Sequence, residues 1–326
     1  MGGSPLKTYT PEQRSRHAEM LANRVRKRHA LLSRKFAKQN IEAFRLYDWD
    51  IPEIRAVVDW YAGHVVVAEY TRTQTGPDWL PEMGLAVAHA LDIPESRLYL
   101  KKRQTAAREG EKRYQRSRKE GQRFSLRERD LRFWVNLSQQ LDTGLFSDHR
   151  DTRSLIRDMA ADQDFLNLYC YTGSFTCYAA AGGARSSVSV DRSGPYLRWA
   201  GDNLALNDLQ GRKHQMIRSD AGVFLEKARD QGRRFTLAMV DPPSFSTIRT
   251  GGEGFDVLRD HPQLIRRVLR IMEPGGVVFF STNHQRFVSR FDDLPASRIE
   301  EITPDTVPED YRNRKVHRCW RIQNPE

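Results

Sequence analysis

The chain has 326 residues, 39% of them hydrophobic, and a formal net charge of +11. This length predicts about two domains with cores that need neither metals nor disulfide bonds. The composition disfavours a membrane-spanning protein, since no apolar run approaches the roughly 20 residues that a bilayer requires. The three cysteines form no CxxC pair, so we expect free thiols in a reducing cytoplasm and no metal site.

The positive charge is concentrated in two short segments. Residues 1–40 hold ten Lys or Arg and two Glu, and residues 101–132 hold thirteen Lys or Arg and five acidic residues. Such segregation predicts contact with a polyanion, because basic side chains that neutralise phosphates release counterions. A set of solvated charges that only aids solubility is the alternative.

Residues 1–40 are predicted to form a basic N-terminal helix over 11–39. Thr10, Pro11 and Gln13 have the spacing of a helix start. The apolar stripe at helical spacing consists of Leu21, Val25, Leu32 and Phe36. Basic side chains cover the other faces of this helix, which is typical of a surface element.

Residues 41–122 are predicted to form a small α+β RNA-binding domain. Its strands are expected at 44–47, 54–60, 64–70 and 97–101, and its helix at 81–91. No catalytic cluster stands out in this region, so we expect it to hold substrate. The segment 102–122 is rich in Arg, Lys, Glu and Gly, a composition that predicts a mobile basic loop.

Residues 123–326 are predicted to form an α/β domain that opens with a hairpin at 123–137. Strands are expected at 164–169, 186–190, 216–219, 235–240 and 277–281, and helices at 151–161, 174–181, 196–206, 221–230 and 261–271. Such alternation predicts a mostly parallel, doubly wound sheet. Ligands bind such sheets at the carboxyl ends of the strands.

Three of these strands end in residues suited to an adenosine-type cofactor. The first runs into Gly173, which would let a ligand approach the backbone closely. The second ends at Asp191, placed to accept hydrogen bonds from ribose hydroxyls, and the third at Asp220, which could accept one from an adenine amino group. Singly, each Asp is more often a helix N-cap, but the pair at successive strand ends favours the cofactor.

The fourth strand ends in the most specific local motif, which runs from Asp241 through Pro242, Pro243 and Ser244 to Phe245. Two prolines after an acidic residue predict a rigid, extended turn. We predict that Asp241, Pro242, Pro243 and Phe245 form the catalytic group, with Asp241 held where cofactor and target base meet and Phe245 offering a stacking face. An ordinary loop is the alternative.

Read in chain order, these motifs resemble the large-subunit ribosomal RNA methyltransferases of the 5-methylcytosine and guanine-N7 types. Within that group the chain is similar to the RlmK-type 23S rRNA guanine-N7 methyltransferase domain. The motifs that carry the likeness are residues 142–150, 167–173, Asp191, Asp220 and 241–245. The resemblance implies a class I (Rossmann-like) methyltransferase fold, S-adenosyl-L-methionine as donor, S-adenosyl-L-homocysteine as product, and a guanosine in 23S rRNA or a large-subunit precursor as target.

The resemblance and the strand-end positions together give a predicted site. The predicted cofactor-binding residues are Phe146, Asp148, Arg150, Asn167, Tyr169, Tyr171, Thr172, Gly173, Ser174, Asp191, Arg192, Asn207, Asp220, Ala221 and Asp241. The predicted RNA-binding residues are Arg113, Arg116, Arg118, Asn283 and Arg286. Many relatives carry a partner methyltransferase domain beyond this sequence, so another chain could supply it.

One departure separates the two types of relative. The 5-methylcytosine enzymes carry a nucleophilic Cys after the fourth or fifth strand, because carbon 5 must be activated by covalent attack. Here residues 241–244 and 280–283 contain no Cys. Guanine N7 has a lone pair and no proton, so its methylation needs extrusion and alignment of the base without a general base. A methyltransferase acting on cytosine or on an exocyclic amine, and a non-catalytic RNA-binding assembly factor, are the alternatives.

Overall fold

The computed structural model describes residues 8–72, 74–103, 123–138, 143–245 and 254–326. By its internal contacts the chain divides into two compact units, one of Met1–Ser147 with Asp310–Arg312 and one of Asp148–Glu309 with Asn313–Glu326. Residues 123–147, which the sequence grouped with the C-terminal domain, belong to the first unit. Along the described residues, no helix combines the length and apolar character needed to cross a membrane.

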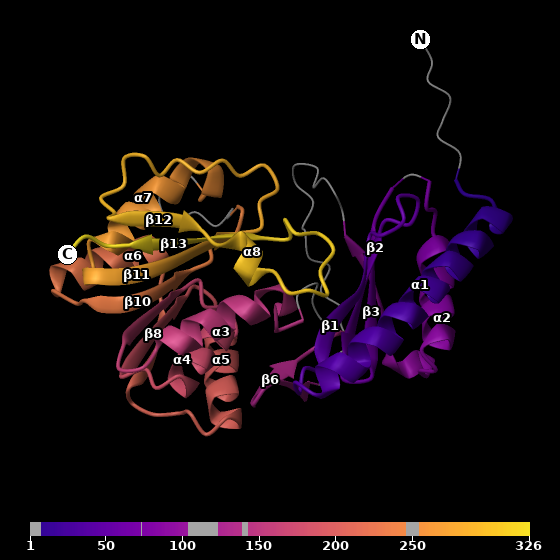
Figure 1. The fold of residues 1–326 in the computed structure, drawn as a ribbon, viewed down its shortest axis with the longest axis horizontal. Coiled ribbons are helices and arrows are strands. Elements are labelled where there is room, and N and C mark those ends of the chain that lie inside the picture. The colour runs from indigo at the N-terminus through magenta and orange to yellow at the C-terminus, as the bar shows by residue number, and fades with distance from the viewer. Residues whose placement is uncertain (1–7, 73, 104–122, 139–142, 246–253) are drawn as a thin grey trace, which may run out of the picture. The chain divides into compact units, whose positions relative to one another are not determined.

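The first unit is a four-stranded sheet with two long helices (Figure 1). Its elements are α1 (Pro11–Ala37), β1 (Ala43–Asp48), β2 (Ala56–Tyr61), β3 (His64–Tyr70), α2 (Trp79–Ala90), η1 (Glu95–Arg97), β4 (Leu98–Arg103), and the hairpin of β5 (Phe124–Glu128) and β6 (Leu131–Val135). The order is β1-β2-β3-β4; the first two pairings are antiparallel and β3 pairs with β4 in parallel. The helix α2 connects the parallel pair, as such a crossover requires.

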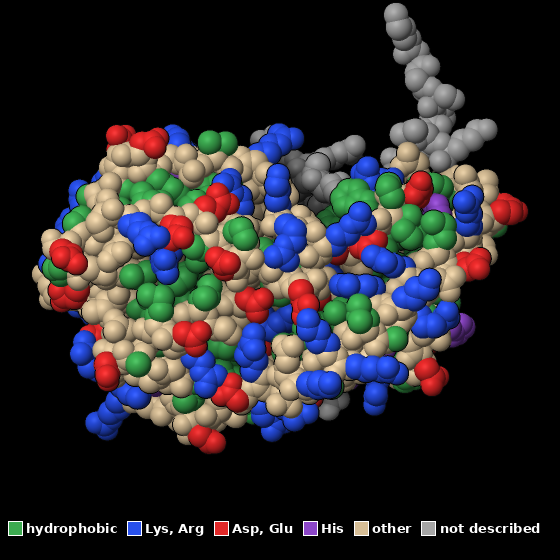
Figure 2. All heavy atoms as spheres, viewed as in Figure 1, with side chains coloured by type: hydrophobic (Ala, Val, Ile, Leu, Met, Phe, Trp, Pro, Cys, Tyr) green, Lys and Arg blue, Asp and Glu red, His purple; other side chains and the backbone are tan. Residues whose placement is uncertain are grey.

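The basic helix α1 forms as its sequence predicts. The Thr10 side chain accepts a hydrogen bond from the Gln13 amide, and the Gln13 side chain accepts one from the Thr10 amide, so two orphan donors are satisfied. The predicted apolar stripe is buried in the core of this unit. Figure 2 shows Lys and Arg side chains gathered where Figure 1 draws α1. Its exposed basic residues are Arg16, Arg24, Arg26, Lys27, Arg34, Lys35 and Lys38.

The second unit is a seven-stranded sheet, counted over the described residues, with helices on both faces. Its elements are η2 (Ser147–His149, which begins in the first unit), α3 (Arg150–Met159), β7 (Asp164–Leu168), α4 (Ser174–Ala181), β8 (Ser186–Asp191), α5 (Gly194–Leu206), β9 (His214–Arg218), α6 (Ala221–Asp230), β10 (Phe235–Val240), α7 (Val257–Leu269), β11 (Met272–Thr282), β12 (Arg298–Glu301), α8 (Thr303–Thr306) and β13 (Arg318–Gln323). The strand order is β12-β13-β11-β10-β7-β8-β9, with β13 antiparallel to both of its neighbours.

Alternation along the strands explains why helices cover both faces. In β10, Ala238 and Val240 join the core that contains Phe224 of α6, whereas Leu237 and Met239 join the core on the other face. A strand that is apolar on both faces needs cover on both. The prediction of a mostly parallel, doubly wound sheet is confirmed.

The structure adds elements that the sequence analysis did not predict. The strand β13 inserts antiparallel beside β11, and β12 and α8 precede it. The helix α7 also begins four residues before the predicted start and contains Pro262 as its sixth residue. The amide that Pro262 lacks would have bonded to Leu258 O, and this carbonyl accepts from the Arg290 guanidinium at 2.8 Å instead.

Candidate active site

The carboxyl ends of the parallel strands meet where the order of the strands reverses. From β7 the chain proceeds to β8 and β9 on one side, and then returns to β10 on the other side of β7. Loops leave in opposite directions at such a switch point and open a crevice between them. Residues 169–173, Asp191, Asp220 and 241–245 all follow strands at this edge, so the structure brings these predicted segments to one edge.

The loop after β7 has an unusual backbone. Tyr169, Tyr171 and Gly173 have φ values of 57°, 51° and 73°. These values lie in the left-handed region that residues other than glycine rarely adopt. A Cβ on Gly173 would lie 2.7 Å from the Cβ of Ala200 in α5. Glycine is therefore required here both by φ and by the close approach of α5.

Asp191 at the end of β8 fixes this loop. One of its carboxylate oxygens accepts a hydrogen bond from the Tyr171 amide at 3.0 Å, and the other accepts one from the Ser193 amide at 2.8 Å. Burial nevertheless raises the pKa of Asp191, and these amide bonds oppose the rise. Each oxygen keeps a second lone pair, so the carboxylate can also accept from a hydroxyl of a ligand.

Asp220 at the end of β9 divides its two oxygens between two neighbours. One oxygen caps α6 by accepting from the Gly222 amide at 2.9 Å. The other lies 3.6 Å from a guanidinium nitrogen of Arg192. The N-cap alternative is thus present in the structure, and it leaves one oxygen of Asp220 available to a ligand.

Asp241 follows β10 and is held by the neighbouring strand. Because Val240 pairs with Phe280, the next residues, Asp241 and Ser281, lie side by side, and the Ser281 hydroxyl donates to the carboxylate at 2.5 Å. Burial raises the pKa of Asp241 to about 6, against the Ser281 hydrogen bond and the charge of His317, both of which lower it. Asp241 thus titrates close to neutral pH.

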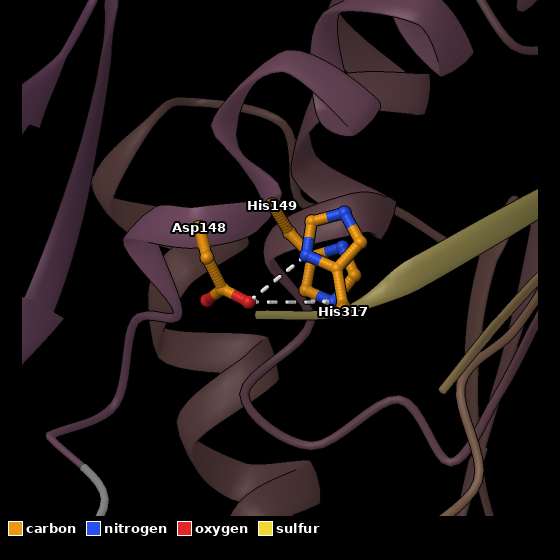
Figure 3. Close-up of side chains that lie close together, drawn as sticks. All are labelled: Asp148, His149 and His317. Atoms are coloured by element: carbon orange, nitrogen blue, oxygen red, sulfur yellow. Dashed lines mark hydrogen bonds and ion pairs between the residues drawn. The ribbon is translucent and has the colours of Figure 1, made fainter. Parts of the chain in front are cut away.

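Two histidines and a second carboxylate, those of His149, His317 and Asp148, lie close together (Figure 3), and His149 is also near Asp241. His149 Nε2 is 3.8 Å from Asp241 and 4.0 Å from Asp148, and His317 Nδ1 is 3.1 Å from Asp148. Burial first, and then the charge of His317, hold the pKa of His149 well below its ordinary value. His149 is therefore neutral, and its contacts with the two carboxylates are polar contacts and not ion pairs.

The same three residues offer one carboxylate and two imidazoles, whose ligand atoms lie within 4.8 Å of one another. Their geometry does not suit a single ion. The rings of His149 and His317 stack at 4.0 Å with an interplanar angle of 14°. Ring nitrogens bind a metal through lone pairs in the ring plane, and two stacked, nearly parallel planes do not converge on one point. His317 also engages Thr306 at 3.0 Å through its other nitrogen, so we read the cluster as a hydrogen-bonded support for Asp241.

The remaining residues of the proline motif, 242–245, differ in how far they are exposed. Pro242 is buried and Pro243 exposed, while the ring of Phe245 is 45% exposed and meets His284 edge-on at 5.7 Å. The Ser244 hydroxyl donates to Asn283 at 2.9 Å, which ties the loop after β10 to the loop after β11. An accessible ring four residues after a braced carboxylate is an arrangement that can stack a planar base.

Several other predicted site residues fall in different settings. Asn167 is buried and donates to Thr176, and Asn203, which the sequence analysis did not single out, donates to Thr172 O at 2.8 Å. Asn207 donates to Asn203 O at 2.7 Å. Arg150, Thr172 and Ala221 are buried, Tyr169, Ser174 and Arg192 are partly exposed, and Asn283 and Arg286 are exposed. Phe146 is 40% exposed and belongs to the first unit. Arg113, Arg116 and Arg118 lie outside the described residues.

Sequence reasoning gave no role to His149, His317 or Ser281. Their contribution depends on segments that are distant in the chain: Ser281 of β11 and His149 of η2 lie near Asp241, and His317, just before β13, stacks on His149. A weak signal was available for His149, which stands between two predicted cofactor residues. For His317 the missing signal was the strand β13, which begins directly after it.

Comparison with known proteins identifies the family of the chain. A family model described as S-adenosylmethionine-dependent methyltransferase matches residues 55–296. The chain is 41% identical to the ribosomal RNA large subunit methyltransferase K of Neisseria meningitidis, over 89% of this chain and 83% of that protein. It is 41% identical to the methyltransferase K/L of Methylococcus capsulatus, over 95% of this chain but 43% of that protein, so it spans less than half of such K/L enzymes.

Solved structures share the fold at low sequence identity. A candidate methyltransferase solved in complex with S-adenosylhomocysteine matches 98% of this chain and 83% of its own, with a TM-score of 0.74 and 23% identity. The S-adenosylmethionine-dependent methyltransferase from Agrobacterium tumefaciens matches 83% of this chain and 88% of its own, with a TM-score of 0.57 and 16% identity. At these identities the likeness concerns the fold alone.

Proposed function

Because this chain belongs to the S-adenosylmethionine-dependent methyltransferase family, and within it to the large-subunit ribosomal RNA methyltransferases of K type, we propose that it methylates N7 of a guanosine in 23S rRNA. The observation that carries this proposal is the edge at β10 and β11. There the carboxylate of Asp241 is braced by Ser281, with the exposed ring of Phe245 close by in the chain. The proposed substrate is the RNA or a large-subunit precursor in the cytoplasm.

The side chains at the carboxyl edge suit S-adenosylmethionine. We assign Asp191 to the ribose hydroxyls and Asp220 to the adenine amino group, since both offer carboxylate lone pairs at successive strand ends. The loop of residues 169–173 and the carboxylates of Asp148 and Asp241 complete an acidic edge that favours a positively charged sulfonium. When bound, the cofactor supplies an activated methyl group.

The cysteines disfavour methylation at carbon 5 of cytosine. Cys319 pairs with Ser281 across β11 and β13 and thus lies near Asp241, but it is fully buried. Burial, and then the charge of Asp241, raise the pKa of Cys319. Cys170 and Cys177 are also buried and have a raised pKa. Because the thiolate is the nucleophile, none of the three is suited to covalent attack.

Methylation at guanine N7 requires fewer protein groups than methylation at carbon 5 of cytosine. Its lone pair attacks without loss of a proton, so the residues need only hold the base and stabilise charge. We assign stacking of the extruded base to Phe245 and the rigidity of the turn to Pro242 and Pro243. With a pKa of about 6, Asp241 is mostly ionised at pH 7 and can stabilise the positive charge that the methylated ring acquires.

The test is to incubate unmodified 23S rRNA with the enzyme and a labelled donor, and to identify the methylated atom by mass spectrometry of the digest. Label at N7 of one guanosine supports the proposal. Label on C5 of cytosine or on an exocyclic amine would overturn the atom assignment but not the family. Calorimetric titration with S-adenosylmethionine separates a non-catalytic assembly factor, which would not bind it.

A further inference from the structure

A second set of strand ends gathers in the first unit. Since β2 is antiparallel to β1 and β3, and β4 is parallel to β3, the carboxyl ends of β1, β3 and β4 and the start of β2 share one edge of the four-stranded sheet. Trp49 follows β1, Arg55 precedes β2, Tyr70 ends β3 and Arg103 ends β4. We call these four residues the Trp49 platform.

The platform alternates aromatic rings and guanidinium groups. The rings of Trp49 and Tyr70 stack at 5.7 Å with an interplanar angle of 26°. Arg55 Cζ lies 4.7 Å from the centroid of Trp49, and Arg103 Cζ lies 5.9 Å from the centroid of Tyr70. Each ring therefore carries its own cation within the range of a cation–π contact.

In the parts of the chain that the structure describes, no ion pair neutralises either guanidinium group of the platform. Among the described residues neither Arg55 nor Arg103 has a carboxylate within ion-pair distance, and the Nε atom of each is buried without a hydrogen-bond partner. Asp48 pairs with Arg45, Asp50 pairs with Arg24, and one oxygen of Glu69 is hydrogen-bonded by Thr75 while its other oxygen is buried. Although each Nε is buried, Arg55 and Arg103 are both partly exposed, and a guanidinium charge without an ion pair suits an anionic ligand.

Trp49 also has an unfavourable backbone conformation and an exposed side chain. Its φ is 53°, in the left-handed region that a bulky residue rarely adopts, and 39% of its surface is exposed. It lies outside the apolar core of this unit. Its amide donates to Ala56 O at 3.1 Å and its indole to Pro52 O at 3.4 Å, so the turn holds the ring in place. Local strain that the core does not explain is a reason to look for a ligand.

We propose that the Trp49 platform binds an unpaired stretch of RNA, with a base stacked on Trp49 and flanking phosphates on Arg55 and Arg103. Aromatic faces accept any base, and guanidinium groups accept phosphate oxygens, so single-stranded RNA matches both parts of the platform. This inference rests on the proposed RNA substrate. It adds that the first unit captures an unpaired segment of the substrate by itself.

The test measures binding of a fluorescein-labelled 12-nucleotide single-stranded RNA to the full chain by anisotropy. Trp49→Ala should weaken this binding by about 10- to 100-fold, the usual loss for one base–aromatic stack, and Trp49→Phe should restore most of it. Leu85→Ala removes an equally exposed apolar side chain, 39% exposed on α2, and should change nothing. A blunt-ended RNA duplex without unpaired bases should bind all four proteins alike.

Two outcomes would overturn the proposal: wild-type affinity in Trp49→Ala with an unchanged melting temperature, or equal weakening for the duplex and the single strand. Competition by polyglutamate as effective as by the RNA would also overturn it, since that would indicate a surface for any polyanion. The readout needs no methyl transfer. The proposal about the Trp49 platform can therefore be tested even if the modified atom is not guanine N7. Calorimetric binding of S-adenosylmethionine should be unchanged in Trp49→Ala.

Discussion

The edge of the seven-stranded sheet and the edge of the four-stranded sheet collect strand ends by the same topology but carry opposite charge. At the first, Asp191, Asp220 and Asp241 follow parallel strands. At the second, Arg55 and Arg103 flank two stacked rings. Parallel strands place their carboxyl ends on one side in any sequence, so topology gathers the residues and side-chain chemistry selects the ligand.

The two edges also differ in how their charges are held. Asp191, Asp220 and Asp241 accept hydrogen bonds from backbone amides or from Ser281, which fix their orientation before a ligand arrives. The guanidinium groups of the Trp49 platform rest on aromatic rings. An oriented carboxylate suits the defined hydroxyl and amino groups of a small molecule. A guanidinium–ring contact, by contrast, suits a polymer of varied sequence.

The largest expected effect is at Asp241. Asp241→Asn should lower turnover about 100- to 1,000-fold, since the positive charge of the product loses its counter-charge. The same change should raise the free energy of unfolding at pH 7 by about 2 kcal/mol, because it removes a partly buried ionised group with a raised pKa. Single-turnover methylation and urea denaturation measure the two. The exposed Asp230→Asn serves as control, and wild-type turnover in Asp241→Asn would remove this residue from the mechanism.

Substitution of Gly173 tests whether stability and cofactor binding depend on the strained loop of residues 169–173. Gly173→Ala should destabilise the protein by about 2–3 kcal/mol, since it combines a positive φ with a Cβ that overlaps Ala200. It should also weaken S-adenosylmethionine binding by about tenfold, as measured by calorimetry. The double variant with Ala200→Gly relieves the overlap and should recover part of the stability. Undiminished cofactor affinity in both variants would separate this loop from the cofactor.

The basic segment 102–122 tests whether RNA binding depends on charges outside the Trp49 platform. Charge reversal at Arg113, Arg116 and Arg118 should weaken RNA binding about tenfold or more and flatten its dependence on salt, with a loss of about 2 in the logarithmic slope. Reversal of the exposed Arg198, Arg212 and Arg234 in the second unit is a matched control. An unchanged slope in the segment variant would reject a role for this segment in binding RNA.

The smallest expected effect is a shift in pH dependence. Turnover should rise with pH through about 6 as Asp241 ionises, and His317→Gln should move this midpoint upward, because the charge of His317 lowers the pKa of Asp241. The raised pKa also means that the folded state holds a proton that the unfolded state releases. The contribution of Asp241 to the unfolding free energy should therefore fall as pH rises from about 4 to 6. His214→Gln, on β9, should leave the midpoint in place, and a midpoint common to all three proteins would assign it to another group.

The sequence by itself determined the regular elements and their order as far as β11. The helix start at Thr10, the apolar stripe of α1 and the alternation of strands and helices after residue 150 are local patterns, and local hydrogen bonding and periodicity suffice to produce them. The same patterns placed Asp191, Asp220 and the motif 241–245 at strand ends, because a strand end is also a local feature.

Only the tertiary structure decided what surrounds these residues. Asp241 meets Ser281 and His149, and His149 stacks on His317, through strands and turns that lie far apart in the chain; the antiparallel β13 that follows His317 pairs by register with β11. The stack of Trp49 on Tyr70 depends in the same way on pairing between β1, β2 and β3. Non-local pairing and the burial that shifts a pKa are properties of the packed chain, so sequence spacing carries no direct signal for them.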